Sequence, residues 1–467
     1  MRAALLAPLA LVACRAPEPP SPADLDLDIP ETFVQENAAG SVVDGPWWEN
    51  FGSVDLDALV LEALERNRDL RAAALSIDAA RAQARIAGSA RMPTVDLGLN
   101  RNRFKNVFVG LPIPGSSGVL SSTATSWGVS LDVAWEADLW GRVGATVRAA
   151  EAQAIASALD FEAARHSLAG QTAKAWIACR LAAGLRDLGS KTSDTYRRDL
   201  ELTSDRFEAG LVSNFDQRIA KARLESSLAQ EQAAEANLDA ALRQLETLCG
   251  RYPAGRLALD GQFPDAPSLP GVGVPSQLLE RRPDLRAAAM RVASADASLE
   301  AARKERFPRF VINASTGRIS DMIDDLTDDD FTVWSLVTAL AQPIFQGGRI
   351  DATIDAADAN AKALLESYAQ VALVAFLEVE TALAVEEHLV AQQAALERAV
   401  NEAEAARSIA QDRYSSGLDS LSVVLEADRT ALDAERSLLN LRAQRLDARV
   451  DLYLALGGDL ERQDVER

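Results

Sequence analysis

The stretch TSWGVSLDVAWEADLWGRV, Thr125 to Val143, joins a two-faced strand to the start of a long helical pattern. Its first half alternates between apolar side chains and small or polar ones. The apolar positions are Trp127, Val129, Leu131, Val133 and Trp135, and the positions between them include Ser126, Ser130, Asp132 and Glu136. This period of two predicts a β-strand with one apolar and one polar face. After Gly141 the period becomes helical.

The stretch has a counterpart later in the chain, VWSLVTALAQPIFQGGRI, which runs from Val333 to Ile350. There Gly348 and Arg349 take the place of Gly141 and Arg142. A strand that leads directly into a long helix therefore occurs twice in one chain.

The two copies belong to a longer internal repeat. RDLRAAA at Arg68 returns as PDLRAAA at Pro283, a shift of 215 residues. From the strand onward the shift is 207 residues, as in the glycine pairs 141 and 348, 210 and 417, and 250 and 457. The difference of eight falls between Phe104 and Ala124, where LPIPGSSG has the composition of a loop.

Each copy is predicted to contain a helix, a strand, a loop, a strand, a long helix, a turn and a second long helix. In the first copy a helical stripe begins at Leu56, Asn67 marks a break, and Pro93 precedes a strand that starts near Val95. In the second copy we expect strands at 308–316 and 332–342, separated by an acidic loop at 317–331.

The first long helix of each copy spans about 65 residues, which is roughly 100 Å at 1.5 Å per residue. We expect an irregularity in it at 188–190, where Leu-Gly-Ser interrupts the pattern. The returning helix of the second copy carries a seven-residue repeat at Leu418, Leu425, Leu432, Leu439, Leu446 and Tyr453. Such a stripe predicts a left-handed supercoil with a neighbouring helix.

The composition excludes several classes of function. A net charge of -21 argues against nucleic acid as the main partner. No run of about 18 apolar residues is present, so we expect no transmembrane helix. His166 and His388 have no cluster of metal ligands beside them, and no nucleophile–base pair or phosphate loop occurs. We therefore predict that the chain is not an enzyme and uses no metal or cofactor.

The N-terminus is predicted to be a signal peptide, residues 1–13, followed by an extended segment at 14–55. Leu11-Val12-Ala13-Cys14 resembles a bacterial lipobox, in which Cys14 is acylated by palmitate or similar chains after cleavage. The alternative is a signal peptide that contains a cysteine by chance. By resemblance to sorted lipoproteins, Arg15 favours the outer membrane. Cys179 and Cys249 are expected to be two buried small side chains, although their pairing is left open.

Two hairpins supply only four strands, which cannot close a barrel. An open sheet edge in lipid leaves backbone groups unpaired, so other chains must complete the sheet. Three chains would supply twelve strands around a water-filled lumen. Ser126, Ser130, Asp132 and Glu136 would then face the lumen. The alternative, a dry sandwich, would bury these carboxylates without cations.

The chain resembles the outer-membrane efflux channel family (TolC-like), and most closely the lipoprotein branch that works with resistance-nodulation-division pumps. The resemblance extends from Trp47 to Gly457. It rests on WWENF, on the DLWGR and FQGGR segments, and on the turns RFEAGLVSNFD and RYSSGLDSLSVVLEA. It implies an α+β fold: a trimer with a twelve-stranded transmembrane β-barrel, a coiled-coil α-helical barrel that extends into the periplasm, and a mixed equatorial belt.

The resemblance also implies a division of the chain. The first structural repeat would take residues 56–250 and the second 276–457. The linker at 251–275 and the tail at 458–467 would lie in the belt.

In this family the two turns between long helices face a periplasmic adaptor protein. The matching residues here are Gly210, Leu211, Gly417 and Leu418, with glycine suited to the positive φ of a helix end. Ala209 and Ser416 precede them, where valine is usual in the family.

Three further residues match the periplasmic gate of the family. Asp216 and Tyr414 match a linked pair, and Glu426 matches an acidic ring that faces the pore, where threefold repetition of carboxylates attracts cations. Asp419 and Ser422 depart from residues that relatives carry at the gate. The alternative is that all three are ordinary solvated helix residues.

The function implied is a passive exit duct for drugs or small toxic compounds, with an adaptor and an inner-membrane pump as partners and no nucleic acid. Two alternatives remain: a duct for type I protein secretion, and a structural lipoprotein that spaces the envelope. A spacer needs no strands with polar inner faces, and the lipobox and WWENF argue against protein secretion.

Overall fold

A computed structural model describes residues 29–30, 32–34, 45–108, 120–259 and 263–458 of the 467-residue chain. The predicted signal peptide, the predicted lipid anchor Cys14 and all but the first residue of the predicted tail lie outside the described residues.

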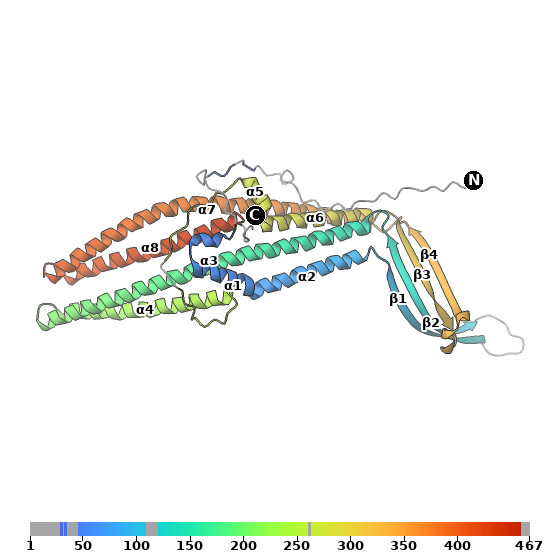
Figure 1. Cartoon of the computed structure of the whole chain (residues 1–467), viewed down its shortest axis with the longest axis horizontal. Coiled ribbons are helices and arrows are strands. Elements are labelled where there is room, and N and C mark those ends of the chain that lie inside the picture. The colour runs from blue at the N-terminus through green and yellow to red at the C-terminus, as the bar shows by residue number, and fades with distance from the viewer. Residues whose placement is uncertain (1–28, 31, 35–44, 109–119, 260–262, 459–467) are drawn as a thin grey trace, which may run out of the picture. The chain divides into compact units, whose positions relative to one another are not determined.

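The elements follow the predicted order in both copies (Figure 1). After a short 3-10 turn, η2 (Trp47–Phe51), the first copy contains α1 (Val54–Arg66), α2 (Arg68–Ser89), β1 (Thr94–Phe108), β2 (Leu120–Ala137), α3 (Arg142–Glu208) and α4 (Asn214–Leu248). The second contains α5 (Pro275–Arg281), α6 (Pro283–Lys304), β3 (Arg309–Ser320), η3 (Asp324–Thr327), η4 (Asp329–Phe331), β4 (Thr332–Ala341), α7 (Arg349–Ser415) and α8 (Leu421–Ala455).

The helices of the two copies have equal lengths. α2 and α6 each have 22 residues, α3 and α7 each have 67, and α4 and α8 each have 35. The element order read from the repeat is therefore confirmed.

Two local predictions are wrong. α3 is continuous through 188–190, and the Leu188 and Gly189 carbonyls accept additional hydrogen bonds from the Thr192 and Ser193 hydroxyls at 2.7 and 3.2 Å. The strands are also longer than predicted, since β1 continues to Phe108 and β2 begins at Leu120. β3 likewise continues to Ser320 rather than Thr316.

The described residues form two compact units, and each unit takes residues from both copies. The sheet unit contains residues 78–156 and 289–367. Its four strands pair in the order β1-β2-β3-β4, all antiparallel (Figure 1). Consecutive strands are therefore neighbours, and β1 and β4 are the two edges.

The helical unit contains the described residues of the ranges 21–77, 157–288 and 368–458, and its main core surrounds the WWENF segment. Trp47 and Trp48 are almost fully buried, and the ring of Trp47 stacks on Tyr453 of α8 with centroids 5.4 Å apart. Asn67 links α2 to α4: its side chain donates to the Leu248 carbonyl at 3.0 Å and accepts from Leu70 N at 3.0 Å. The break predicted at Asn67 is confirmed.

Candidate functional site: the two-faced sheet and the helical turns

The polar residues of the sheet form rows across its strands. Asp132 of β2 lies opposite Asp96 of β1 and Ser315 of β3, and Ser315 lies opposite Ser335 of β4. The Asp132 carboxylate accepts hydrogen bonds from Ser130 Oγ at 2.7 Å and from Ser315 Oγ at 2.6 Å. Because side chains alternate between faces along a strand, the residues predicted to line a lumen share this face. They are Ser126, Ser130, Asp132 and Glu136.

The opposite face of the sheet is apolar. One row across the four strands consists of Val95, Val133, Ala314 and Leu336, and the next consists of Leu97, Leu131, Thr316 and Trp334. No described residue covers this face well: Leu97 is 77% exposed and Trp334 is 78% exposed. An apolar surface of this kind is stable against lipid rather than water.

Two tryptophans bound the apolar face on β2. Trp127 and Trp135 lie eight residues apart, which is about 27 Å at ~3.4 Å per residue. The apolar band of an outer-membrane barrel is about 25 Å tall and is flanked by aromatic residues. The guanidinium of Arg101 lies 4.9 Å from the Trp127 ring centroid, and Trp135 Nε1 donates to the Arg91 carbonyl at 3.1 Å. Both tryptophans thus have polar neighbours, as expected at the two surfaces of a membrane.

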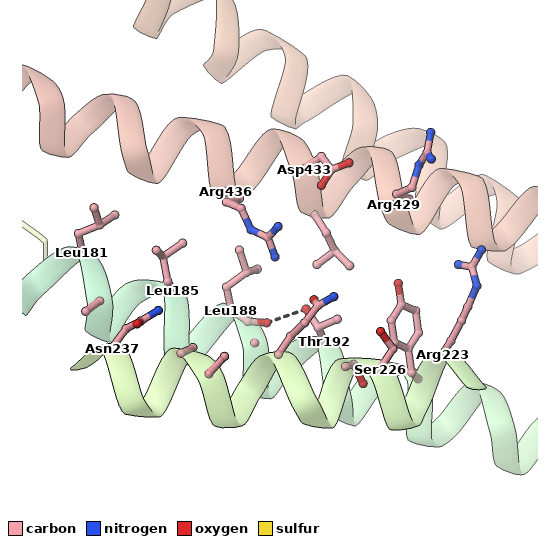
Figure 2. A pocket seen from close by; sticks show the side chains of 18 of the residues that line it. Leu181, Leu185, Leu188, Thr192, Arg223, Ser226, Asn237, Arg429, Asp433 and Arg436 are labelled. Atoms are coloured by element: carbon pink, nitrogen blue, oxygen red, sulfur yellow. Dashed lines mark hydrogen bonds between the residues drawn. The ribbon is translucent and has the colours of Figure 1, made fainter. Parts of the chain in front are cut away.

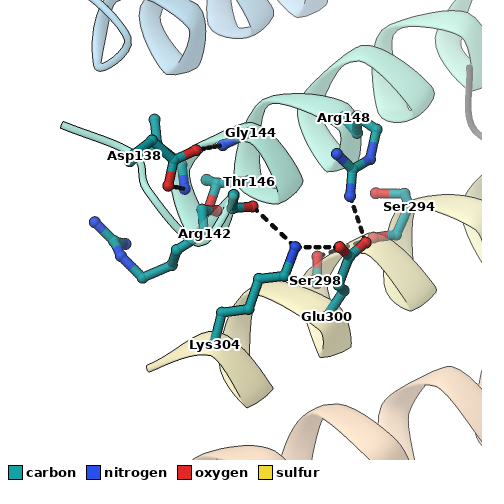
Figure 3. A network of polar contacts seen from close by, with 11 residues as sticks. Asp138, Arg142, Gly144, Thr146, Arg148, Ser294, Ser298, Glu300 and Lys304 are labelled. Carbon is teal, nitrogen blue, oxygen red and sulfur yellow. Dashed lines mark hydrogen bonds and ion pairs between the residues drawn. The ribbon is translucent and has the colours of Figure 1, made fainter. Parts of the chain in front are cut away.

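The segment between β2 and α3 is held by a compact polar network (Figure 3). The Asp138 carboxylate accepts from Val143 N at 3.1 Å and from Gly144 N at 2.6 Å, so it satisfies two free N–H groups at the start of α3. Gly141 has a φ of 76°, and Lys304 of α6 donates to its carbonyl at 3.3 Å. The strand-to-helix transition is therefore held by Asp138 from within the segment and by Lys304 from α6.

Glu300 of α6 joins this network through ion pairs with Lys304 and Arg148 (Figure 3). Burial acts to raise the pKa of Glu300, but hydrogen bonds from the two cations outweigh it and hold that pKa below its ordinary value. Glu136, predicted to face a lumen, forms an ion pair with Arg142 at 2.8 Å. Its charge is therefore largely compensated at the end of the strand.

The two turns between long helices have the same backbone geometry. Gly210 and Gly417 have φ values of 71° and 74°. After the first, Leu211 N donates to the Arg206 carbonyl at 2.8 Å, and after the second, Leu418 N donates to the Arg413 carbonyl at 2.9 Å. These bonds form the Schellman pattern that ends a helix at glycine. The two leucines project into solvent, 74% and 68% exposed.

The structure does not join Asp216 to Tyr414 within one chain. The Asp216 carboxylate accepts from Ser213 N at 3.0 Å and from Ser213 Oγ at 2.7 Å, and so forms a capping box at the start of α4. The Tyr414 hydroxyl is buried without a hydrogen-bond partner among the described residues.

Arg206 is the partner of Tyr414 instead. Its guanidinium lies 4.4 Å from the Tyr414 ring centroid and donates to the Tyr414 carbonyl at 3.0 Å and the Ser415 carbonyl at 2.8 Å. Sequence reasoning did not select Arg206. The arginine–aromatic pair that precedes each turn, Arg206-Phe207 and Arg413-Tyr414, is the sequence signal that could have found it.

Comparison with known proteins identifies the family. The model of the family described as "Outer membrane efflux protein" matches residues 59–251 and 274–458. The chain belongs to the outer membrane efflux protein family. This efflux protein is 32% identical to outer membrane protein OprJ of Pseudomonas aeruginosa, over 90% of this chain and 87% of that protein. It is also 32% identical to the toluene efflux pump outer membrane protein TtgI of Pseudomonas putida, with coverage of 88% and 86%.

A solved structure has the same fold. The Neisseria gonorrhoeae MtrE outer membrane channel, in its open state, superposes with a TM-score of 0.82 at 28% identity, covering 95% of this chain and 99% of that one. The TolC-like fold and the outer-membrane location predicted from the sequence are therefore confirmed. The chain is the outer-membrane channel component of an efflux system.

Glu426, the predicted ring residue of the efflux protein, lies near the start of α8. It is well exposed and forms an ion pair with Arg429 at 3.1 Å. Among the described residues no group of three or more His, Cys, Asp or Glu side chains is arranged to hold a metal ion.

Both described cysteines of the efflux protein are free and buried, as expected. Burial raises the pKa of Cys179 to about 12 and the pKa of Cys249 to about 11. Both thiols therefore stay protonated and unreactive near neutral pH.

We expected no transmembrane helix, because the sequence has no run of about 18 apolar residues. By length and composition alone, however, α7 would qualify as one. α7 contains an 18-residue window with a mean hydropathy of 1.5, of which 39% is buried within the chain. Apolar residues occur on more than one side of α7, and Leu373, Val374 and Leu377 are 47%, 40% and 64% exposed. A helix that packs against neighbours on two sides has this composition, because both of its sides must be apolar.

Proposed function

We propose that three copies of this efflux protein share one barrel and form a passive exit duct for drugs or small toxic compounds. A periplasmic adaptor and an inner-membrane pump of the resistance-nodulation-division class would complete a tripartite system. The duct itself would carry out no catalysis. TtgI is named for toluene efflux, and small apolar compounds are the class of cargo that this relative suggests.

One observation carries the proposal: a four-stranded sheet with a polar face, an apolar face and two unpaired edges. An unpaired edge costs several kcal/mol for each backbone group left without a partner in lipid. Pairing β4 of one copy with β1 of the next removes every edge when the ring closes. Twelve strands then leave a lumen lined by the polar rows.

Two adjacent residues of β2 test which face meets lipid. Leu131 lies on the apolar face and Ser130 on the polar face. We expect Leu131→Asp to impair assembly in the outer membrane, because a charged side chain on the lipid face of a barrel is destabilising in every copy. Ser130→Asp should insert normally and conduct in planar bilayers. Equal effects of the two substitutions on trimer yield and conductance would show that the faces are not lipid and lumen.

The lipid anchor is a separate proposal that rests on the sequence around Cys14. Cys14→Ser should abolish incorporation of labelled palmitate, whereas trimers should still insert through their strands. Labelling that persists in this variant would exclude Cys14 as the acceptor.

Partner binding at Leu211 and Leu418 is tested by Leu211→Asp and Leu418→Asp, which should reduce efflux in cells but leave conductance in planar bilayers unchanged.

A further inference from the structure

A cavity of about 910 Å³ lies in the helical unit, between α3 and α4 on one side and α8 on the other (Figure 2). It exists because the facing positions of α3 and α4 carry short side chains. These are Ala182, Gly189, Ser226, Ser227, Ala233 and Ala234. The volume falls in the range of pockets that bind small organic molecules, about 300–1,000 Å³.

One wall of the cavity is apolar. Leu181, Leu185 and Leu188 follow one another along α3 at helical spacing, and Leu432 of α8 also lines the cavity (Figure 2). Leu188 is 8% exposed, whereas Leu181 and Leu185 are only half-buried. The cavity therefore offers apolar contact that the chain itself leaves incomplete.

The cavity is also lined by basic side chains. The arginines come from both sides: Arg429 and Arg436 from α8, and Arg223 from α4 beside the leucine row. They line the cavity together with a single carboxylate, that of Asp433. In a chain with a net charge of -21, three arginines against one aspartate is an unusual local balance. A cavity of this sign favours anions and disfavours cations.

The three arginines differ in what they already bind. Arg223 donates to the Leu425 carbonyl at 3.1 Å, and Arg429 pairs with Glu426 at 3.1 Å. Arg436 extends from α8 toward α3 and α4 (Figure 2), and its guanidinium has no hydrogen-bond or ion-pair partner among the residues that the structure describes. Arg436 thus has all its donors available to a ligand.

The internal repeat shows that the fold does not require these residues. A shift of 207 residues places Leu181, Leu185 and Leu188 on His388, Gln392 and Ala395. The same shift places Arg429 and Arg436 on Ala222 and Ala229. Both copies form a helical hairpin of the same length, so such a hairpin forms without the leucine row and without these two arginines.

We propose that this cavity binds an amphipathic organic anion, with its acid group on Arg436 and its apolar body along the leucines of α3 and Leu432. The binding site lies wholly in the helical unit and does not depend on the assignment of the sheet faces. The matched probes are 8-anilinonaphthalene-1-sulfonate, which carries the acid group, and N-phenyl-1-naphthylamine, which has the same rings without it.

Occupancy of the cavity can be measured by how strongly a bound probe protects a single engineered thiol from alkylation. Ser226 lines the cavity and is exposed, and Ser226→Cys in the full-length assembled protein in amphipol should react quickly with a maleimide. The parent supplies the background, which comes from Cys14 where it is not acylated and from the buried Cys179 and Cys249. We expect the sulfonate to slow the reaction at a concentration at least tenfold below that needed for the uncharged probe.

Arg436→Gln, introduced into the Ser226→Cys protein, should raise the half-protecting concentration of the sulfonate about tenfold. The loss of a hydrogen bond to a charged group weakens binding by roughly this factor. The uncharged probe should be unaffected. Leu185→Gln should weaken protection by both probes. Arg398→Gln, an exposed arginine of α7 outside the cavity, should change neither. Assembly mass and bilayer conductance should match the parent in each variant.

Three results would overturn the proposal. The first is a labelling rate that neither probe changes. The second is equal protection by the two probes, which would mean that the cavity does not select anions. The third is an equal effect of Arg436→Gln and Arg398→Gln, which would place the anion elsewhere.

Discussion

At the scale of single residues, Arg206 fastens the end of α3 to the end of α7. Two of its nitrogens donate to the carbonyls of Tyr414 and Ser415, and its guanidinium covers the Tyr414 ring. The last carbonyls of a helix have no partner within that helix, so one side chain satisfies groups that would otherwise face water. Its counterpart in the second copy, Arg413, instead pairs with Asp419 at 2.6 Å. The arginine before the turn therefore reaches the other hairpin in the first copy, whereas in the second it pairs within its own turn.

We predict that Arg206→Ala destabilises the helical unit by about 1–2 kcal/mol, because two charge-assisted hydrogen bonds are lost. It should also raise single-channel conductance if the turns form the closed end of the duct. Arg206→Lys should recover only part of the effect, since lysine lacks the planar fork. Arg197→Ala is the matched control, an exposed arginine of α3 paired only with Asp194. Thermal unfolding and bilayer recordings that do not distinguish Arg206→Ala from Arg197→Ala would contradict this role.

Glu246 holds the linker that follows α4. The side chain is 4% exposed, and its carboxylate accepts from Gly255 N at 2.7 Å and from Arg256 N at 2.9 Å. Burial acts to raise the pKa of Glu246, but these backbone N–H groups outweigh it and lower that pKa below its ordinary value. A group with a lowered folded pKa stabilises the fold above its unfolded pKa of about 4.5, and this contribution is lost as the pH falls.

Glu246→Gln should therefore cost about 1–3 kcal/mol, because an amide cannot accept both bonds as the carboxylate does. We expect trypsin to cleave faster after Arg251 and Arg256 in this variant, and in the parent at acid pH. Glu225→Gln, an exposed glutamate of the same helix, is the control. Cleavage rates that are equal in the two variants would show that Glu246 does not hold the linker.

At the scale of helices, the break expected in α3 is absent because packing outweighs local propensity. A glycine inside a helix costs about 1 kcal/mol relative to alanine. A Cβ at Gly189 would lie 3.6 Å from the backbone of Glu231 in α4, an ordinary contact distance, so the glycine is tolerated there rather than required. Leu188 and Ser193 on either side of it are 8% and 1% exposed, and their burial keeps this part of α3 packed. The sequence shows the glycine but not the burial of its neighbours, and the prediction failed for this reason.

A pair of carboxyl groups joins α7 to α8. Glu404 and Glu435 share a hydrogen bond, and the charged groups that face Glu435 are Glu404, Arg407 and Lys191. Burial, followed by the neighbouring Glu404 carboxyl, raises the pKa of Glu435 to about 7. Since the unfolded value is 4.5, Glu435 contributes stability that is complete below about pH 4.5 and is lost as the pH rises through about 7. The hydrogen bond with Glu435 lowers the pKa of Glu404, whose contribution is instead present at higher pH and lost as the pH falls below its ordinary range.

The unfolding temperature of the helical unit should accordingly fall between pH 5 and pH 8. Glu435→Gln should flatten this dependence, because the amide can donate to Glu404 at every pH. Glu402→Gln, an exposed neighbour on α7, should leave the slope unchanged. The measurement is thermal unfolding followed by circular dichroism at several pH values. An undiminished slope in Glu435→Gln would assign the pH dependence to other groups.

At the scale of the whole molecule, periodicity and the internal repeat were enough to predict the order of the elements and the two-faced strands, and the resemblance to the efflux channel family supplied the rest of the fold. Strand alternation at Trp127–Trp135 gave the two faces, and the repeated Gly-Arg pairs gave the strand-to-helix transitions. The contacts of single polar residues were harder to predict. Asp216 was matched to Tyr414 by position, yet it caps α4 within the chain, because a carboxylate at the third helical position satisfies the nearest free N–H groups first. Arg206 was missed because its partners lie some 208 residues away.

The assembled duct should be selective for cations, and the row through Asp96 and Asp132 is the reason. The two carboxylates lie opposite each other on the polar face, and threefold repetition would place six of them around one level of the lumen. The apolar face cannot compensate this charge across the sheet.

We predict that Asp96→Asn with Asp132→Asn reduces the preference for potassium over chloride, measured as the reversal potential across a salt gradient. The effect should weaken at high salt, where charges are screened within a few ångströms. Asp78→Asn, on α2 of the same unit, should have no effect. A reversal potential that the double variant leaves unchanged would mean that this row does not line the conducting path, and the polar face would then have to be assigned to something other than a lumen.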